Sequence, residues 1–278
     1  MAYWICRTCA VEHADRPDVC AICADERQWV PASGQAWATL DELAAEGHTV
    51  EVTELEPGLL ALHTAPGVGI GQQSKVVRTT GGALLWDPLG FVDDAGVAAV
   101  VDAAGGGNVV IAASHPHMFG VQVEWSRRIA AATGKDVPVL VSEADAAWVA
   151  RPDPVIATWT GEREVLPGVV LSQPGGHFPG SAVAHWTDGA DGRGVLLSGD
   201  TIFANPDRTS VSFMRSYPNR IPLSGAVVTR VAEHVARRPF ERLYNNFEGV
   251  VPADARDVVL RSAQRHAAWV RGDFDHLT

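Results

Sequence analysis

Cysteine is confined to the start of this 278-residue sequence: there are four, and none follows position 23. A disulfide framework is therefore excluded from the main part of the chain. The sequence also lacks any run close to the ~18 apolar residues of a membrane-spanning helix, so we expect no membrane partner. The first residues, Met1–Cys6, lack the basic and apolar regions of a secretory signal, which predicts a cytoplasmic protein.

Basic residues are few as well. There are 22 lysines and arginines against 33 aspartates and glutamates, which gives a net charge of −11. Adjacent basic pairs occur at Arg127–Arg128 and Arg237–Arg238, each within a predicted helix, where they are typical of a solvated face. Binding to a nucleic-acid backbone needs clustered lysine and arginine, so no nucleic-acid partner is expected. The composition does not specify an oligomeric state.

The four cysteines form two C-x-x-C pairs separated by ten residues: Cys6 with Cys9, and Cys20 with Cys23. Four thiolates complete the coordination of one zinc or iron ion, and in a reducing compartment such clustering favours a metal site over disulfides. The segment is too short to fold around a core of its own without such a staple. The sequence therefore predicts a small domain over residues 1–32, folded by its metal, and a larger domain over residues 33–278.

This cysteine pattern resembles a zinc ribbon and also the short knuckles of rubredoxin-like proteins. Rubredoxin-type knuckles usually have glycine after the second cysteine and proline inside the second pair, where this sequence has Ala10 and Ala21. The resemblance therefore implies a structural zinc ion, with iron as the alternative cofactor. His13 lies between the pairs, but four cysteines already complete a tetrahedron. We expect the segment to cap the main domain, with electron delivery or docking of a partner as alternative roles.

A histidine pair follows a predicted buried strand of the main domain. Ser114-His115-Pro116-His117 comes directly after Val109–Ala113, an apolar run typical of such a strand. Because the chain leaves its regular pleat there, histidines two positions apart can direct both imidazoles toward one point. Neutral imidazole binds zinc, copper, iron and nickel. The pair favours a metal site, although alone it is also compatible with an exposed turn.

Two further segments place polar groups where strands end. His177 lies within the glycine-rich segment Gly175–Gly180, in which glycine allows sharp bends and close backbone approach. Val195–Leu197 is an apolar strand that leads through Ser-Gly to Asp200, which puts a carboxylate at a sheet edge. Each segment alone is also typical of a turn. Their order along the chain makes the combined interpretation as one site stronger.

The ordered set of strand–H-x-H, G-G-H and strand–G-D resembles the metallo-β-lactamase superfamily from about Gln35 to the C-terminus. The resemblance implies an α/β (α+β) fold, a four-layer αββα sandwich with its site at one edge of the sheets, and the alternation of predicted strands and helices agrees. Asp87, which ends a predicted strand, matches the early structural aspartate of the family. The implied metal ligands are His115, His117, His177 and Asp200.

The sequence also departs from the family pattern. The usual motif continues as H-x-H-x-D-H, but the last two positions are Phe119 and Gly120. The histidine expected late in the chain is missing from Leu243–Gly249. In the family, the aspartate and histidine missing at Phe119 and Gly120 normally bind a second metal, and that aspartate also orients the nucleophilic water. Three histidines and one carboxylate remain, which suffice for one four-coordinate zinc. If Asp200 binds loosely or not at all, the three histidines leave a position for water.

The predicted function is that of a metal-dependent hydrolase, most simply a zinc enzyme, acting on a small ester, amide, lactone or thioester. Zinc can lower the pKa of a bound water to about 7 and so make hydroxide available. Asp200 is the favoured catalytic group because it lies nearest in the predicted site. Glu124 and Asp145 are further candidates for a base.

The segment Ser212–Arg220 follows Asp200 and mixes aromatic, basic and amide groups. In the family, the region after this aspartate often shapes the substrate pocket. Arg215 is therefore predicted to meet an anion, and Tyr217 or Asn219 to polarise a carbonyl. A structured loop with core aromatics is the alternative interpretation.

Two other functions remain open, since one fold hosts many chemistries. A redox protein would pass electrons from thiolate-bound iron to the sandwich site. A non-catalytic member would keep the fold and bind a ligand or partner, and Phe119 and Gly120 favour this alternative.

Overall fold

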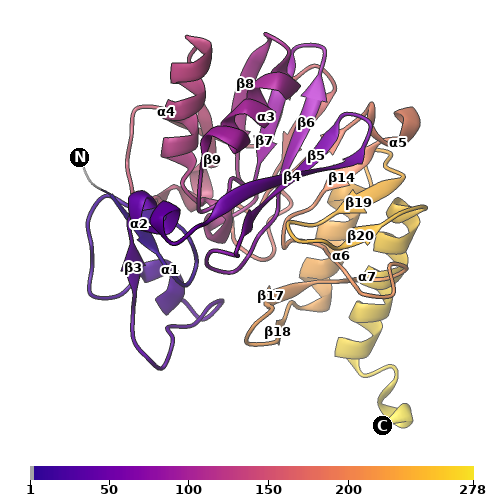
Figure 1. Cartoon of the computed structure of the whole chain (residues 1–278). Coiled ribbons are helices and arrows are strands. Elements are labelled where there is room, and N and C mark those ends of the chain that lie inside the picture. Colours follow the sequence, from indigo (N-terminus) through magenta and orange to yellow (C-terminus); the bar gives the residue numbers. More distant parts are fainter. Residues whose placement is uncertain (1–2) are drawn as a thin grey trace.

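Two large β-sheets form the body of the protein (Figure 1), whose computed structural model describes residues 3–278. The first sheet has the order β10 (Ile156–Trp159), β9 (Val139–Ser142), β8 (Asn108–Ala112), β7 (Gly82–Trp86), β6 (Ser74–Thr79), β5 (Leu59–Ala65) and β4 (Thr49–Glu56). The second sheet has the order β11 (Glu162–Leu166), β12 (Val169–Ser172), β13 (Val183–Trp186), β14 (Val195–Leu197), β19 (Arg242–Tyr244) and β20 (Val250–Val251).

The apolar runs of the sequence become strands that are buried on both faces. In β8, Val109 and Ile111 pack toward the outer helices, whereas Val110 and Ala112 pack toward the second sheet. This alternation follows from the two-residue period of a strand. Strand β14 does the same in the second sheet, where Leu196 faces the opposite helical layer. The sandwich therefore has three apolar interfaces, one between the sheets and one beneath each helical layer.

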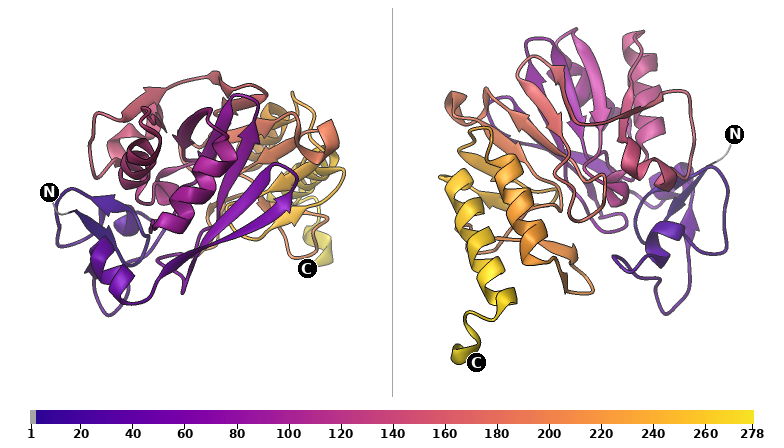
Figure 2. Two further views of the ribbon diagram at one scale, coloured as in Figure 1. Left: turned by 45° about the horizontal axis from the view of Figure 1, so that its top comes forward. Right: turned by 180° about the vertical axis from the view of Figure 1, so that it is seen from behind.

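Helices cover both outer faces. Helices α3 (Asp94–Ala104) and α4 (Gln122–Thr133) pack on the first sheet, and α6 (Gly225–Val235) and α7 (Ala255–Arg271) lie on the side of the second sheet. In Figure 2 the orange and yellow helices lie on the opposite side of the molecule from the magenta helix α4. These layers confirm the predicted αββα sandwich. The final helix begins at Ala255, a few residues after strand β20, which pairs with β19.

The shorter elements fill the connections. They are α5 (Gly189–Gly192), β15 (Phe203–Ala204), β16 (Val211–Ser212), β17 (Met214–Ser216), β18 (Ile221–Pro222) and the 3₁₀ helices η1 (Pro116–Met118), η2 (Glu143–Trp148) and η3 (Asp275–Leu277). Within the described residues, no helix is both long and apolar enough to span a membrane.

The cysteine-bearing segment has a small sheet of its own. Strands β2 (Glu12–His13), β1 (Trp4–Cys6) and β3 (Trp37–Ala38) pair in that order, and helices α1 (Ala21–Ala24) and α2 (Leu40–Ala45) flank them. The third strand thus lies beyond residue 32, where the sequence predicts a domain boundary; that boundary stays a prediction. The indigo segment lies beside one end of the sandwich (Figure 1), and its side chains share one apolar core with the first sheet.

Candidate metal centres

The candidate ligands of the sandwich come from three loops that leave strands of both sheets. The loop after β8 carries His115 and His117, the loop after β12 carries His177, and the loop after β14 carries Asp200. Strands β7 and β8 run parallel, so Asp87 leaves its sheet at the same edge as the histidine pair. The fold therefore brings together the four residues that the sequence predicts as metal ligands, although His115 and Asp200 are 85 positions apart.

The four donor groups are spaced as ligands of one ion. The Nε2 atom of His115 lies 3.5 Å from Oδ2 of Asp200. The Nε2 atom of His177 lies 3.4 Å from Nδ1 of His117 and 3.9 Å from the same Asp200 oxygen. A tetrahedral zinc ion with ligands at about 2.1 Å would place neighbouring donors about 3.4 Å apart. The donor set therefore fits a single zinc ion.

Hydrogen bonds outside the cluster fix how two imidazoles face it. The Nδ1 atom of His115 lies 2.9 Å from Oγ of Ser114, whose hydroxyl is 3.1 Å from Asp87 and whose backbone N–H donates to that carboxylate at 2.6 Å. The Nδ1–H of His177 donates to the Met214 carbonyl at 3.0 Å. Both partners leave Nε2 free to bind metal, the usual arrangement around ligating histidines. Asp87 thus acts through Ser114.

The protonation states also suit a metal. Burial lowers the pKa of His177 to about 4 and that of His117 well below its usual value, and the neighbouring His115 adds to both effects. Metal ligation requires neutral imidazole. Burial tends to raise the pKa of Asp200, but the adjacent His115 and His177 outweigh it and hold the pKa below its usual value. Asp200 Oδ1 is buried without a hydrogen-bond partner in the described chain, which is costly unless another polar group or ion meets it.

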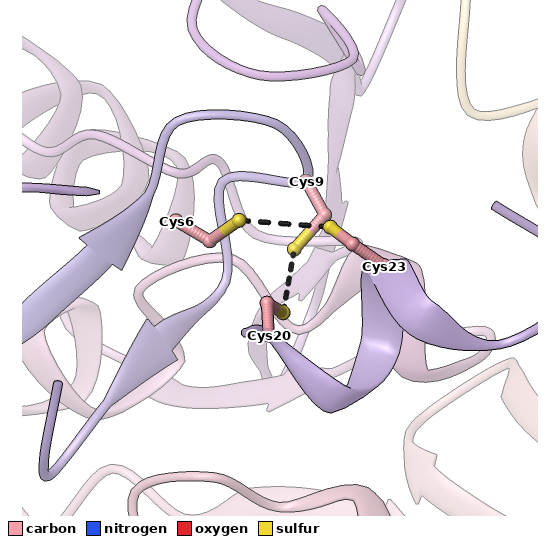
Figure 3. Close-up of side chains that lie close together, drawn as sticks. All are labelled: Cys6, Cys9, Cys20 and Cys23. Carbon is pink, nitrogen blue, oxygen red and sulfur yellow. Dashed lines mark hydrogen bonds between the residues drawn. The ribbon is translucent and has the colours of Figure 1, made fainter. Parts of the chain in front are cut away.

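The cysteine cluster has sulfur donors, and its four residues come from a shorter stretch of the chain, positions 6–23. Sγ of Cys6 lies 3.6 Å from Sγ of Cys23, and Sγ of Cys9 lies 3.8 Å from Sγ of Cys20. Figure 3 shows the four side chains pointing toward one another. The separations are far longer than a disulfide bond of about 2.05 Å. A tetrahedron with Zn–S distances of about 2.3 Å has edges of about 3.8 Å, so the geometry fits a closed four-thiolate site.

Two polar side chains surround the cysteines. Gln35 donates through Nε2 to Sγ of Cys6 at 3.1 Å, and its Oε1 accepts the backbone N–H of Cys20 at 3.1 Å. The Nε2 atom of His13 lies 3.4 Å from Sγ of Cys20. Sequence reasoning missed Gln35, because an amide in a linker gives no sign of the sulfur it will meet. His13 lies beside the sulfur of Cys20, but the four cysteines already supply four donors, so His13 is not needed as a ligand.

The two other candidate bases lie outside the histidine cluster. Glu124 is partly buried on α4, where it pairs with Arg128 at 3.2 Å and lies 3.8 Å from the buried Arg151. Asp145 is buried, accepts the N–H of Gly180 at 2.9 Å through Oδ1, and has a raised pKa because of burial. Of the three carboxylates predicted as candidate bases, Asp200 is the one that belongs to the histidine cluster.

The residues predicted to bind substrate have other partners. Arg215 pairs with Glu26, and Nδ2 of Asn219 donates to the carbonyl of the same residue at 2.8 Å. The Tyr217 hydroxyl donates to the backbone carbonyl of Asp200 at 3.1 Å. All three polar groups are thus used in packing against the cysteine-bearing segment or the Asp200 loop. Their role in substrate binding stays a prediction.

The departures from the family motif have a structural reason. Phe119 is 2% exposed and packs in the core shared with the cysteine-bearing segment. Gly120 has a φ of +50°, and a Cβ there would lie 2.1 Å from the Pro88 carbonyl, so a larger residue does not fit. The N–H of Glu12 donates to the Gly120 carbonyl at 2.9 Å. The loop that carries Phe119 and Gly120 thus contacts the small domain. These two residues stand where the family motif has ligands for a second metal.

An amide occupies the place of the late histidine. Asn246 is 1% exposed, and neither of its side-chain polar atoms finds a hydrogen-bond partner among the described residues. It lies close enough to Asp200 to help hold down the pKa of that carboxyl. The N–H of Gln73 donates to the Asn246 carbonyl at 2.8 Å. A cavity of about 320 Å³ flanks this contact and is lined in part by Gln72, Gln73, Leu89, Phe247 and Glu248.

Comparisons with known proteins agree with this architecture. No family model matches the chain. The uncharacterized protein YmaE of Bacillus subtilis (strain 168) is 40% identical over 281 residues, which cover 99% of this chain and 100% of that protein. The DIM-1 metallo-β-lactamase superposes with a TM-score of 0.56 at 12% identity, over 80% of this chain and 98% of its own. The mono-zinc form of the FIM-1 enzyme from Pseudomonas aeruginosa gives 0.53 at 14% identity, over 78% and 96%.

Proposed function

The chain belongs to the family of YmaE from Bacillus subtilis and has the metallo-β-lactamase fold, and from this premise we propose that it is a zinc-dependent hydrolase. The substrate class is a small ester, amide, lactone or thioester. The observation that carries the proposal is the cluster of three histidines and one carboxylate, whose donor atoms all lie within 4.8 Å of one another.

Zinc held by this cluster supplies Lewis-acid activation of water near neutral pH. The residues of the chain supply orientation. Ser114 and the Met214 carbonyl hold His115 and His177 with Nε2 turned inward. Asp200 directs Oδ2 toward those nitrogens and keeps Oδ1 without a partner in the described chain, so Oδ1 is the oxygen available to accept a proton. That placement supports Asp200 as the catalytic base.

The cavity beside Asn246 is the proposed route for a small substrate. Its lining combines amides, one carboxylate and apolar groups, which suits a polar molecule without a large charge. Asn246 precedes Phe247 of the cavity lining and acts on the carboxyl of Asp200. Its buried Nδ2 has no hydrogen-bond partner among the described residues, so it is the group we expect to donate to a substrate carbonyl. The mono-zinc form of FIM-1 is consistent with one ion in such a site.

The test is a hydrolysis screen on zinc-loaded protein with nitrophenyl esters, an aryl lactone, an acyl thioester and a β-lactam amide. We expect turnover of at least one class by the wild type and none by His115→Ala/His117→Ala. An exposed histidine changed in the same way, His276→Ala, is the control and should keep full activity. Turnover that survives in the double variant would contradict the proposal.

A non-catalytic metal protein is the second candidate, and the burial of the cluster favours it. Asp200, its most exposed donor residue, is 7% exposed, and each histidine is 1% exposed. Zinc retained at the histidines without turnover of any substrate in the screen would select this candidate. A visible absorption band of ferric thiolate in the purified protein would instead favour the redox alternative.

A further inference from the structure

The segment after the second cysteine pair runs directly onto the loops of the histidine cluster. It starts at the end of helix α1, which carries Cys23, and continues through residues 25–28. Oγ of Ser216 donates to the carbonyl of Arg27 at 3.0 Å, and Nδ2 of Asn219 donates to the carbonyls on both sides of it. Backbone carbonyls of the segment are thus fixed by side chains from the β17–β18 hairpin.

Arg27 extends from this segment into the protein. Its side chain is almost fully buried, and Nε donates to the backbone carbonyl of His177 at 2.8 Å. Its guanidinium carbon lies 4.0 Å from the ring centroid of Phe178, and Nη1 donates to Asp25 at 2.6 Å. Arginine suits this place because one planar group can hydrogen-bond along its edge and stack on an aromatic face.

Phe178 transmits this contact to all three histidines. Its ring centroid lies 5.6 Å from that of His115, 4.9 Å from that of His117 and 5.3 Å from that of His177. Arg27 therefore holds both the backbone of one ligand and the ring against which the three imidazoles rest.

A second tie joins the same small domain to the loop of His117. The N–H of Glu12 donates to the Gly120 carbonyl, and Oε1 of Glu12 accepts the N–H of Val123 at the start of α4. The other carboxylate oxygen pairs with Arg151. The small domain thus holds the His177 loop through Arg27 and the loop after His117 through Glu12.

We propose that Arg27 is a positioning residue of the histidine metal site, through which the folded four-cysteine domain pre-organises that site. The inference rests on the proposed binding of metal at the histidines. Groups that orient metal ligands from outside typically contribute about 10–100-fold to metal affinity. Loss of the Arg27 contacts frees the His177 backbone and the Phe178 ring while leaving every donor atom in the chain.

The experiment measures cobalt(II) affinity in the full-length protein by competition with a chelator. Thiolate-to-cobalt charge transfer reports the cysteines, and the part of the d–d absorption that His115→Ala/His117→Ala lacks reports the histidines. We expect Arg27→Gln to weaken binding at the histidines by about 10–100-fold and to leave the thiolate band unchanged. Arg27→Lys should recover part of the loss. Arg16→Gln, on the exposed surface of the same small domain, is the matched control and should behave as wild type.

Wild-type affinity at the histidines in Arg27→Gln would overturn the inference and leave the proposed function intact. Absence of histidine-bound cobalt in the wild type would overturn both. If Arg27→Gln also loses its thiolate band, Arg27→Lys decides in its place. A selective loss at the histidines in that variant supports the inference, and unchanged affinity contradicts it.

Discussion

The two metal clusters are both buried and both offer four donors, but the chain builds them in different ways. The cysteines all come from positions 6–23: Cys6 ends the short strand β1, Cys9 lies in the turn after it, and Cys20 and Cys23 lie at the start of and within the four-residue helix α1. The histidine cluster takes its ligands from loops after β8, β12 and β14, which two large sheets already hold in place. The first site must be closed by its ion, whereas the second has its imidazoles oriented beforehand by Ser114 and the Met214 carbonyl.

The comparison separates two roles of metal in one chain. On the proposed function, an ion among the four thiolates would support folding, and an ion among the histidines would support chemistry. The small domain is also part of the larger site, because Arg27 and Glu12 reach its loops. Substitution of the cysteines should therefore weaken metal binding at the histidines as well, but substitution of the histidines should not affect metal binding at the cysteines.

The largest expected effect is on hydrogen exchange when a chelator removes metal. The amides of Cys6 and Ala10, which donate to the carbonyls of Val11 at 3.1 Å and Cys6 at 2.8 Å, should lose protection by at least about a thousandfold, because structural zinc supplies roughly 10–16 kcal/mol of apparent folding free energy in zinc-finger peptides. The amide of Ser114, which donates to Asp87 at 2.6 Å, should keep its protection. Equal loss in both regions would contradict the difference drawn between them.

Asp200→Asn should lower kcat/KM by about 10²–10⁴-fold, the usual contribution of a positioned acid or base. The amide keeps the shape of the side chain and removes the proton acceptor. Because Asp200 is also one of the four candidate donors, metal content is measured in parallel and activity is compared per bound zinc ion. Asp102→Asn, on the exposed surface of α3, is the control, and equal activity of the two variants would remove Asp200 from the mechanism.

The sequence was sufficient for the sandwich and for the ligands that follow its strands. The predicted strand Val109–Ala113 corresponds to β8 (Asn108–Ala112), with His115 and His117 just beyond it, because strand period and strand ends are local properties. Arg27 gave no such signal, since its partner His177 lies 150 positions away. Only the folded chain shows that the two meet.

The same reason explains the segment Ser212–Arg220. Its composition suggested contacts with a substrate, but the packing gives Arg215 and Asn219 partners in Glu26 and its neighbours. A polar group in a loop can serve a ligand or a neighbouring domain, and the sequence does not distinguish the two. In the sequence, Phe119 marks only the loss of a metal ligand from the family motif. In the structure, its side chain packs in the core shared with the small domain.

A buried histidine outside both clusters offers a pH reference. Burial lowers the pKa of His185 to about 4, and its Nε2–H donates to the Val235 carbonyl at 3.2 Å. In the unfolded chain His185 takes up a proton near pH 6.5. Lowering the pH from above 6.5 toward 4 therefore favours the unfolded state. We expect His185 to cost about 2 kcal/mol of stability between pH 7.5 and pH 5.

Urea unfolding of wild type and His185→Gln in parallel isolates this effect, because both proteins carry the same two clusters. The stability of the variant should fall less over that pH range. Identical pH dependence in the two proteins would assign the acid sensitivity to the metal sites instead.

Ser114→Ala should have the smallest effect, a loss of about tenfold in metal affinity at the histidines. The change removes the hydroxyl between His115 and Asp87 but keeps the backbone N–H bond to that carboxylate. Chelator competition monitors the affinity, with Ser33→Ala in the exposed linker as control. No change would mean that the backbone alone orients the imidazole.

The most direct test of two separate sites is zinc per chain, measured by mass spectrometry on purified wild type and on His115→Ala/His117→Ala. Two zinc ions in the wild type and one in the variant would place one ion in each cluster, as the donor geometry predicts. One zinc ion in both proteins would leave the histidine cluster without metal and contradict the account.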